Sequence, residues 1–203
     1  MGRSETISIY INLRKITLKS ALLITIGSMN YPNDSWFDIE TLINVAQPQS
    51  ILLLGDCDAA FLQNYLQQRT LLELPCSVTQ LRVNQIEDFN ALQQKFDVAI
   101  AINWFEHFDK RRGEQVLARL RDVLCPQYCI CLPLQSSSNS NNVDKSWQIT
   151  DLFSFALSKV ASYTVDNVEY GLFKYNINDY KKTPDWLNAD NWANPQMWGK
   201  YWW

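Results

Sequence analysis

The stretch Ile51-Leu-Leu-Leu-Gly-Asp-Cys-Asp-Ala-Ala60 decides the fold of this chain. Four consecutive apolar residues, 51–54, stop at Gly55, and an amphipathic segment begins a few residues later. Continuous apolar runs are typical of parallel strands that helices cover on both faces. The pattern predicts a buried strand, a tight turn and a helix, and α/β proteins bind their ligands at turns of this kind.

The same alternation of strands and helices continues along the chain. Two more apolar runs, 98–102 and 128–134, flank an amphipathic helix predicted over 110–124, and this order implies right-handed βαβ crossovers. A short strand is predicted over 77–81 and a strand pair over 163–168 and 171–177, close enough to be antiparallel. We expect an α/β fold, a Rossmann-like three-layer sandwich with a mostly parallel sheet and an antiparallel C-terminal strand pair.

Two helices flank this predicted sheet in the sequence. One begins at Asp34 or Ser35, with Phe37, Leu42, Ile43 and Ala46 predicted on its inner side. A second is predicted over 150–161, before the strand pair.

Composition argues against several classes of partner. The 203 residues carry a net charge of −3 and offer no basic stripe for a phosphate backbone, so a nucleic acid partner is not expected. No apolar run approaches the roughly 20 residues of a membrane-spanning helix, so no membrane association is expected. The remaining partners are a small molecule or a protein.

The cysteines indicate a reducing compartment and no metal site. Five cysteines form an odd set in a chain too long to need disulfides, which favours a cytoplasmic protein with buried structural thiols. There is no CxxC pair and only one histidine, His107, so no metal is expected.

Two segments lie outside the predicted domain of residues 30–180, and one predicted loop lies within it. Residues 1–29 are an N-terminal arm, or an upstream extension if translation begins at Met29. Residues 135–145 are polar, low-complexity sequence and are predicted to be a flexible loop. Residues 181–203 form a tail with five of the eight tryptophans, and we expect it to pack on the domain, since so many aromatics are atypical of disorder.

Residues 50–177 resemble the class I adenosylmethionine-dependent methyltransferases. The resemblance rests on the strand, glycine, turn and helix of residues 51–61. It rests above all on three motifs: Phe-Asp-Val-Ala-Ile at 96–100, Glu-His at 106–107 and Leu-Arg-Asp-Val-Leu at 120–124. The resemblance implies S-adenosylmethionine as cofactor, with Gly55, Asp56, Cys57, Asp58, Asn103 and Trp104 as candidate contacts.

The cofactor turn departs from the family pattern. The family has an acid in the first strand and three glycines in the turn, whereas this chain has Leu53, Gly55, Cys57 and Ala59. Glycines there leave space for the cofactor against the backbone, and the extra Cβ atoms occupy it. The acid that holds the ribose at the end of the second strand is also missing, and the path to Phe96 is short, which suggests a trimmed strand and helix.

Each candidate residue also has a purely structural role open to it. Asp56 and Asp58 form the turn and cap the helix or contact a cofactor; they would repel a pyrophosphate, which disfavours a nicotinamide cofactor. Glu106 and His107 are the candidate catalytic pair, with His107 as a general base, or they simply open a helix. Asp97 is expected to anchor a strand start.

The tail carries a second resemblance. Pro-Asp-Trp-Leu-Asn at 184–188, Trp-Ala-Asn-Pro at 192–195 and Lys-Tyr-Trp-Trp at 200–203 resemble the C-terminus of a small bacterial family of unknown function with a methyltransferase-like core. Two functions follow: a non-catalytic or divergent relative that keeps the scaffold for binding, and an active methyltransferase on a small molecule or protein.

Overall fold

A computed structural model describes residues 31–134, 146–180, 190, 194–197 and 200. The predicted arm, loop 135–145 and most of the tail lie outside the described residues. Strands are β1 (Ser50–Leu54), β2 (Ser77–Leu81), β3 (Val98–Ile102), β4 (Gln127–Leu134), β5 (Ser158–Val165) and β6 (Val168–Asn176). Helices are α1 (Asn33–Ala46), α2 (Gln63–Leu71), α3 (Ile86–Ala91), α4 (Lys110–Arg119), α5 (Ile149–Ser154) and α6 (Ile177–Tyr180). Short helical turns are η1 (Ala59–Leu62), η2 (Val83–Gln85), η3 (Phe105–His107), η4 (Leu120–Leu124) and η7 (Pro195–Met197).

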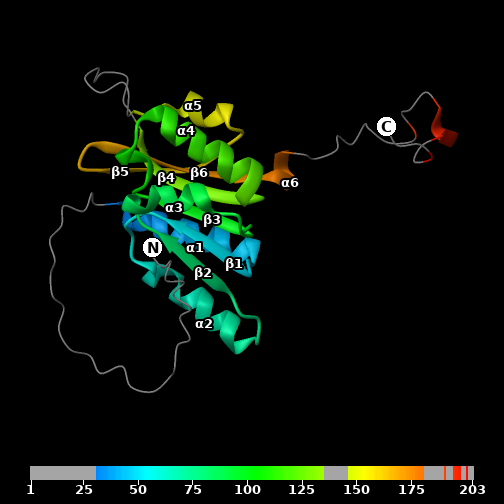
Figure 1. Cartoon of the computed structure of the whole chain (residues 1–203), viewed down its shortest axis with the longest axis horizontal. Coiled ribbons are helices and arrows are strands. Elements are labelled where there is room, and N and C mark those ends of the chain that lie inside the picture. The colour runs from blue at the N-terminus through cyan, green and yellow to red at the C-terminus, as the bar shows by residue number, and fades with distance from the viewer. Residues whose placement is uncertain (1–30, 135–145, 181–189, 191–193, 198–199, 201–203) are drawn as a thin grey trace.

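The described strands form one sheet in the order β2-β1-β3-β4-β6-β5 (Figure 1). The pairs β1–β2, β1–β3 and β3–β4 are parallel, whereas β6 runs antiparallel to both β4 and β5. This confirms the predicted mostly parallel sheet with an antiparallel C-terminal pair. Strand β2 is the edge strand on one side of the described sheet.

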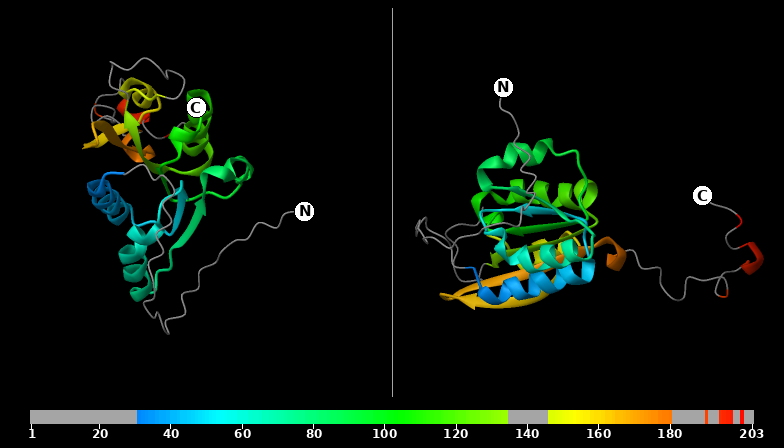
Figure 2. Two further views of the ribbon diagram at one scale, coloured as in Figure 1. Left: turned by 90° about the vertical axis from the view of Figure 1, so that its left-hand side faces the viewer. Right: turned by 90° about the horizontal axis from the view of Figure 1, so that it is seen from below.

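Helices cover both faces of the sheet, so the fold has three layers (Figure 2). Alternate residues of each central strand face opposite layers, because successive side chains in a strand point to opposite faces. One face packs against α1, η1 and α2 and is centred on Ile51, Leu53, Ile100 and Leu172. The other packs against α3, α4 and α5 and is centred on Leu52, Ala101, Ile130 and Phe173.

Asp97 anchors the start of β1 to the start of β3, as predicted. Its Oδ2 accepts hydrogen bonds from the backbone N–H of Gln49 at 2.8 Å and of Ser50 at 2.9 Å, and from the Ser50 hydroxyl at 3.0 Å. The carboxylate therefore sets the register at the amino ends of two neighbouring strands.

Two details of the predicted helices were wrong. Phe37 is 71% exposed, whereas Ile43 is buried as predicted, together with Ile39 and Ser35. The helix predicted over 150–161 ends at Ser154, and β5 begins at 158. Strands β5 and β6 join through a two-residue turn whose residues both have positive φ, Asp166 at 50° and Asn167 at 62°, the geometry that a tight hairpin requires.

Within the described residues, no helix is both long enough and apolar enough to cross a membrane. The five cysteines are free thiols: Cys125, Cys129 and Cys131 are buried, and Cys57 and Cys76 are half-buried.

Candidate functional site

The turn after β1 lies at the carboxyl edge of the parallel strands, where the sequence predicted a ligand site. Gly55 has a φ of +120°, and a Cβ there would lie 1.8 Å from the carbonyl oxygen of Ile102 at the end of β3. Its N–H donates to the carbonyl of Leu81 at 2.9 Å. Only glycine fits this position, because the ends of three neighbouring strands meet around it.

A side chain from β2 binds the carbonyls of this turn. Nε2 of Gln80 donates hydrogen bonds to the carbonyl oxygens of Cys57 at 2.9 Å and of Gly55 at 3.2 Å. Sequence reasoning missed Gln80, which carries no signal beyond its place in a short strand. The turn is therefore fastened to β2 by a side chain as well as by the backbone.

Asp58 caps the helical turn that follows, as predicted. Its Oδ1 accepts a hydrogen bond from the N–H of Ala60 at 2.9 Å, and η1 begins at residue 59. Asp56 is exposed beside it. Cys57 is half-buried, and burial raises the pKa of its thiol to about 12, so it is a neutral thiol near pH 7.

Asn103 and Trp104 follow β3 at the same edge. Asn103 adopts a left-handed backbone with φ 52°, and its Oδ1 lies 3.1 Å from Nε2 of His107. Trp104 is 0% exposed and packs against the rings of Phe89 and Phe108. The structure thus brings Asn103 to His107 and places the Trp104 ring in the core; their part in ligand binding stays a prediction.

Glu106 lies in η3, which directly follows this edge, and its carboxyl group is buried. Its Oε1 accepts a hydrogen bond from the hydroxyl of Tyr31, just before α1, and its Oε2 has no hydrogen-bond partner among the described residues. Burial, opposed by the nearby backbone N–H groups of Glu106 and Trp104, raises the pKa of the carboxyl group from 4.5 to about 7. His107, its neighbour in sequence, is exposed.

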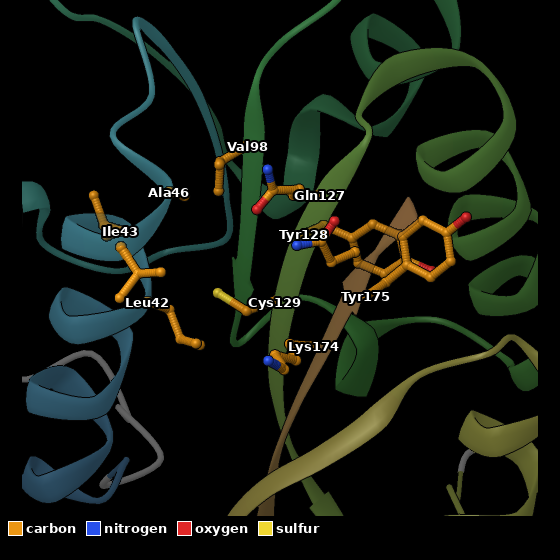
Figure 3. A pocket seen from close by; sticks show the side chains of 11 residues that line it. Leu42, Ile43, Ala46, Val98, Gln127, Tyr128, Cys129, Lys174 and Tyr175 are labelled. Carbon is orange, nitrogen blue, oxygen red and sulfur yellow. The ribbon is translucent and has the colours of Figure 1, made fainter. Parts of the chain in front are cut away.

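A pocket described in the structure lies at the other end of the sheet (Figure 3). It is lined by the end of α1, the first residues of β3 and β4 and the last residues of β6, among them Leu42, Val98, Cys129 and Lys174 (Figure 3). None of the predicted site residues lines it. Its volume of about 70 Å³ is well below the few hundred Å³ of a typical small-molecule site.

The described residues hold no group of three or more His, Cys, Asp or Glu side chains that could bind a metal ion.

The sheet order and this edge define the class: a Rossmann-like α/β protein with the methyltransferase-type sheet. Within that class the chain belongs to a family of unknown function, DUF6231, whose model matches residues 34–203. No curated protein sequence matches the chain.

Solved structures with a similar fold include magnesium protoporphyrin IX methyltransferase from Synechocystis PCC 6803 with bound SAH. It is 9% identical, and the match covers 70% of this chain and 81% of that chain with a TM-score of 0.46. An O-methyltransferase family protein from Burkholderia thailandensis is 9% identical, covering 71% of this chain and 58% of that chain, with a TM-score of 0.39. The 1,6-didemethyltoxoflavin-N1-methyltransferase of Burkholderia thailandensis is 13% identical, covering 69% and 76%, with a TM-score of 0.43. The chain thus spans less than two thirds of the second of these proteins.

Proposed function

We propose that this protein is a divergent, non-catalytic member of the methyltransferase-like class, which keeps the scaffold to bind a small molecule or a protein. The observation that carries the proposal is the turn after β1, where Gln80 binds the carbonyl oxygens of Gly55 and Cys57. Two backbone acceptors at the edge where a cofactor would lie are thereby used within the protein.

The other residues of the turn fit adenosylmethionine poorly. Cys57 and Ala59 carry Cβ atoms where the family has glycines. One carboxylate oxygen of Asp58 already accepts the hydrogen bond that caps the following helical turn. At the end of β2, where the family has the acid for the ribose, Leu81 is buried and the exposed Arg82 follows it. We therefore derive no chemical step through this cofactor.

Glu106 supports the alternative, an active adenosylmethionine-dependent methyltransferase acting on a small molecule or protein. A carboxyl group with a pKa of about 7 at the carboxyl edge is suited to accept a proton near neutral pH. In this alternative Glu106 is the base, and the exposed His107 lies beside it.

Calorimetric titration with adenosylmethionine and adenosylhomocysteine separates the two functions. The proposal predicts no binding of either compound in the micromolar range. Micromolar binding that is lost in Asp56→Lys, on the turn, but kept in Asp179→Lys, in α6 at the opposite end of the sheet, would overturn it. Gly55 is unsuitable for this test because any side chain there collides with Ile102.

A further inference from the structure

Glu106 has a buried carboxylate oxygen whose partner is not supplied by the described part of the chain. Tyr31 donates to Oε1, while Oε2 is fully buried and without a hydrogen bond. An unsatisfied buried acceptor costs about 1–3 kcal/mol, so native proteins rarely leave one without a ligand or water. The free oxygen therefore marks a position where a hydrogen-bond donor is missing.

Two tyrosine rings stand beside this carboxyl group. The ring centroids of Tyr31 and Tyr170 are 5.1 Å apart. Burial is the main cause that raises the pKa of the Tyr170 phenol, and the charge of the nearby Glu106 carboxylate raises it further. Tyr31 comes from the chain just before α1 and Tyr170 from β6, so three separate elements meet here. The Tyr31 hydroxyl group and the Tyr170 side chain therefore border the carboxyl group of Glu106.

Within the described ranges, no lysine or arginine forms an ion pair with Glu106. The pKa of the Cys131 thiol is raised to about 12, chiefly by burial, and the Tyr170 phenol is neutral at pH 7. The ring of His107 bonds to Asn103. A carboxylate without a counter-ion in low dielectric attracts a cation strongly.

The chemistry of the group selects one kind of ligand. The negative charge of Glu106 repels an anion. Ca²⁺ and Mg²⁺ need several oxygen ligands, and the described residues place no cluster of acidic side chains around Glu106. An alkylammonium ion fits both features, since an N–H donates to the free oxygen and its charge neutralises the carboxylate.

We propose that Glu106, Tyr31 and Tyr170 form a recognition site for a primary ammonium group of the ligand that this scaffold binds. The inference rests on the proposed function, because it assigns a ligand class to the edge that the scaffold retains.

An amide NMR titration at pH 8, where Glu106 is ionised, tests the site with n-butylammonium. Its neutral counterpart 1-butanol has the same chain and a hydroxyl group in place of the charge. We expect saturable shifts in residues 103–107 and 170 with n-butylammonium, and at least tenfold weaker binding of 1-butanol. Concentrations up to about 100 mM cover the millimolar range expected of a single charged contact.

Variants locate the binding. Glu106→Gln keeps the shape and removes the charge, and it should weaken n-butylammonium binding at least tenfold, whereas Glu114→Gln on α4 should leave binding unchanged. If Glu106→Gln does not fold, Tyr31→Leu replaces it and should weaken binding several-fold.

Three results would overturn the inference: no saturable shifts with n-butylammonium, equal affinity for 1-butanol, or full binding in the Glu106 and Tyr31 variants. If n-butylammonium fails while adenosylmethionine also does not bind, only this inference falls. If adenosylmethionine binds at the turn while n-butylammonium binds at Glu106, only the proposed function falls.

Discussion

Glu106 should make the folded protein less stable as the pH rises through neutrality. The folded state raises the pKa of its carboxyl group from 4.5 to about 7, so between these values the folded chain holds a proton that the unfolded chain has released. By linkage, the free energy of unfolding then falls as pH rises through this window and levels off above it. Since one pKa unit corresponds to about 1.36 kcal/mol, the loss is about 3 kcal/mol.

The measurement is urea-induced unfolding, followed by tryptophan fluorescence, at intervals from about pH 4.5 to about pH 8. Glu106→Gln removes the titrating carboxyl group but keeps a side chain of nearly the same size. The difference between the wild-type and variant profiles of unfolding free energy against pH therefore reports the contribution of this carboxyl group. The wild type should lose about 3 kcal/mol more than the variant across the window. Glu114→Gln, at a half-buried position on α4, is the matched control substitution.

Parallel profiles for wild type and Glu106→Gln would refute the reasoning, because they would show that the carboxyl group titrates alike in the folded and unfolded chains. A wild type that gains stability with rising pH relative to the variant would refute it too, since the sign would be opposite.

Three further substitutions test how the strands and helices are held. Gly55→Ala places a Cβ 1.8 Å from the carbonyl of Ile102 at a φ of +120°, so it should cost about 3 kcal/mol or more, seen as a large fall in melting temperature or loss of soluble protein; a wild-type melting temperature would contradict the close contact. Asp97→Ala removes the acceptor of three hydrogen bonds at the start of β1 and should lower the free energy of unfolding in urea by about 1–3 kcal/mol. Asp109→Ala removes the N-cap of α4, in which the Asp109 Oδ1 accepts a hydrogen bond from a backbone N–H at 2.8 Å. Calorimetry should show a fall of about 1 kcal/mol in the free energy of unfolding, whereas Asp109→Asn should keep most of the wild-type stability.

The central sheet was predictable because its strands are apolar at consecutive positions. Residues 51–54 and 98–102 need no knowledge of their partners to be identified as buried strands, and the structure confirms both. The hairpin was harder to place. Strand β5 is an exposed edge strand in which Ala161, Tyr163 and Val165 are half-buried between exposed residues, so its apolar signal is weak and a helix was predicted over its first residues.

The candidate site divides in a similar way. Asp58 was predictable as a cap because its partner, Ala60, is two residues away. The hydrogen bonds of Gln80 span 23 and 25 residues, and that between Tyr31 and Glu106 spans 75. Such contacts depend on the packed sheet and leave no local pattern, which is why Gln80, Tyr31 and Tyr170 were not predicted.

The hydrogen bonds of the Gln80 amide also determine which residues must change if a nucleoside site is to be engineered into this protein. Cys57→Gly and Ala59→Gly would remove the two Cβ atoms, but the carbonyls of the turn would remain engaged by the same amide. Gln80→Ala would release them, and only the combination would give an incoming ligand both space and free acceptors. Because Gly55 contacts β3, such a redesign must keep Gly55 and the ends of β1 and β3 as they are, and act only on residues 57 and 59 and on Gln80 of β2.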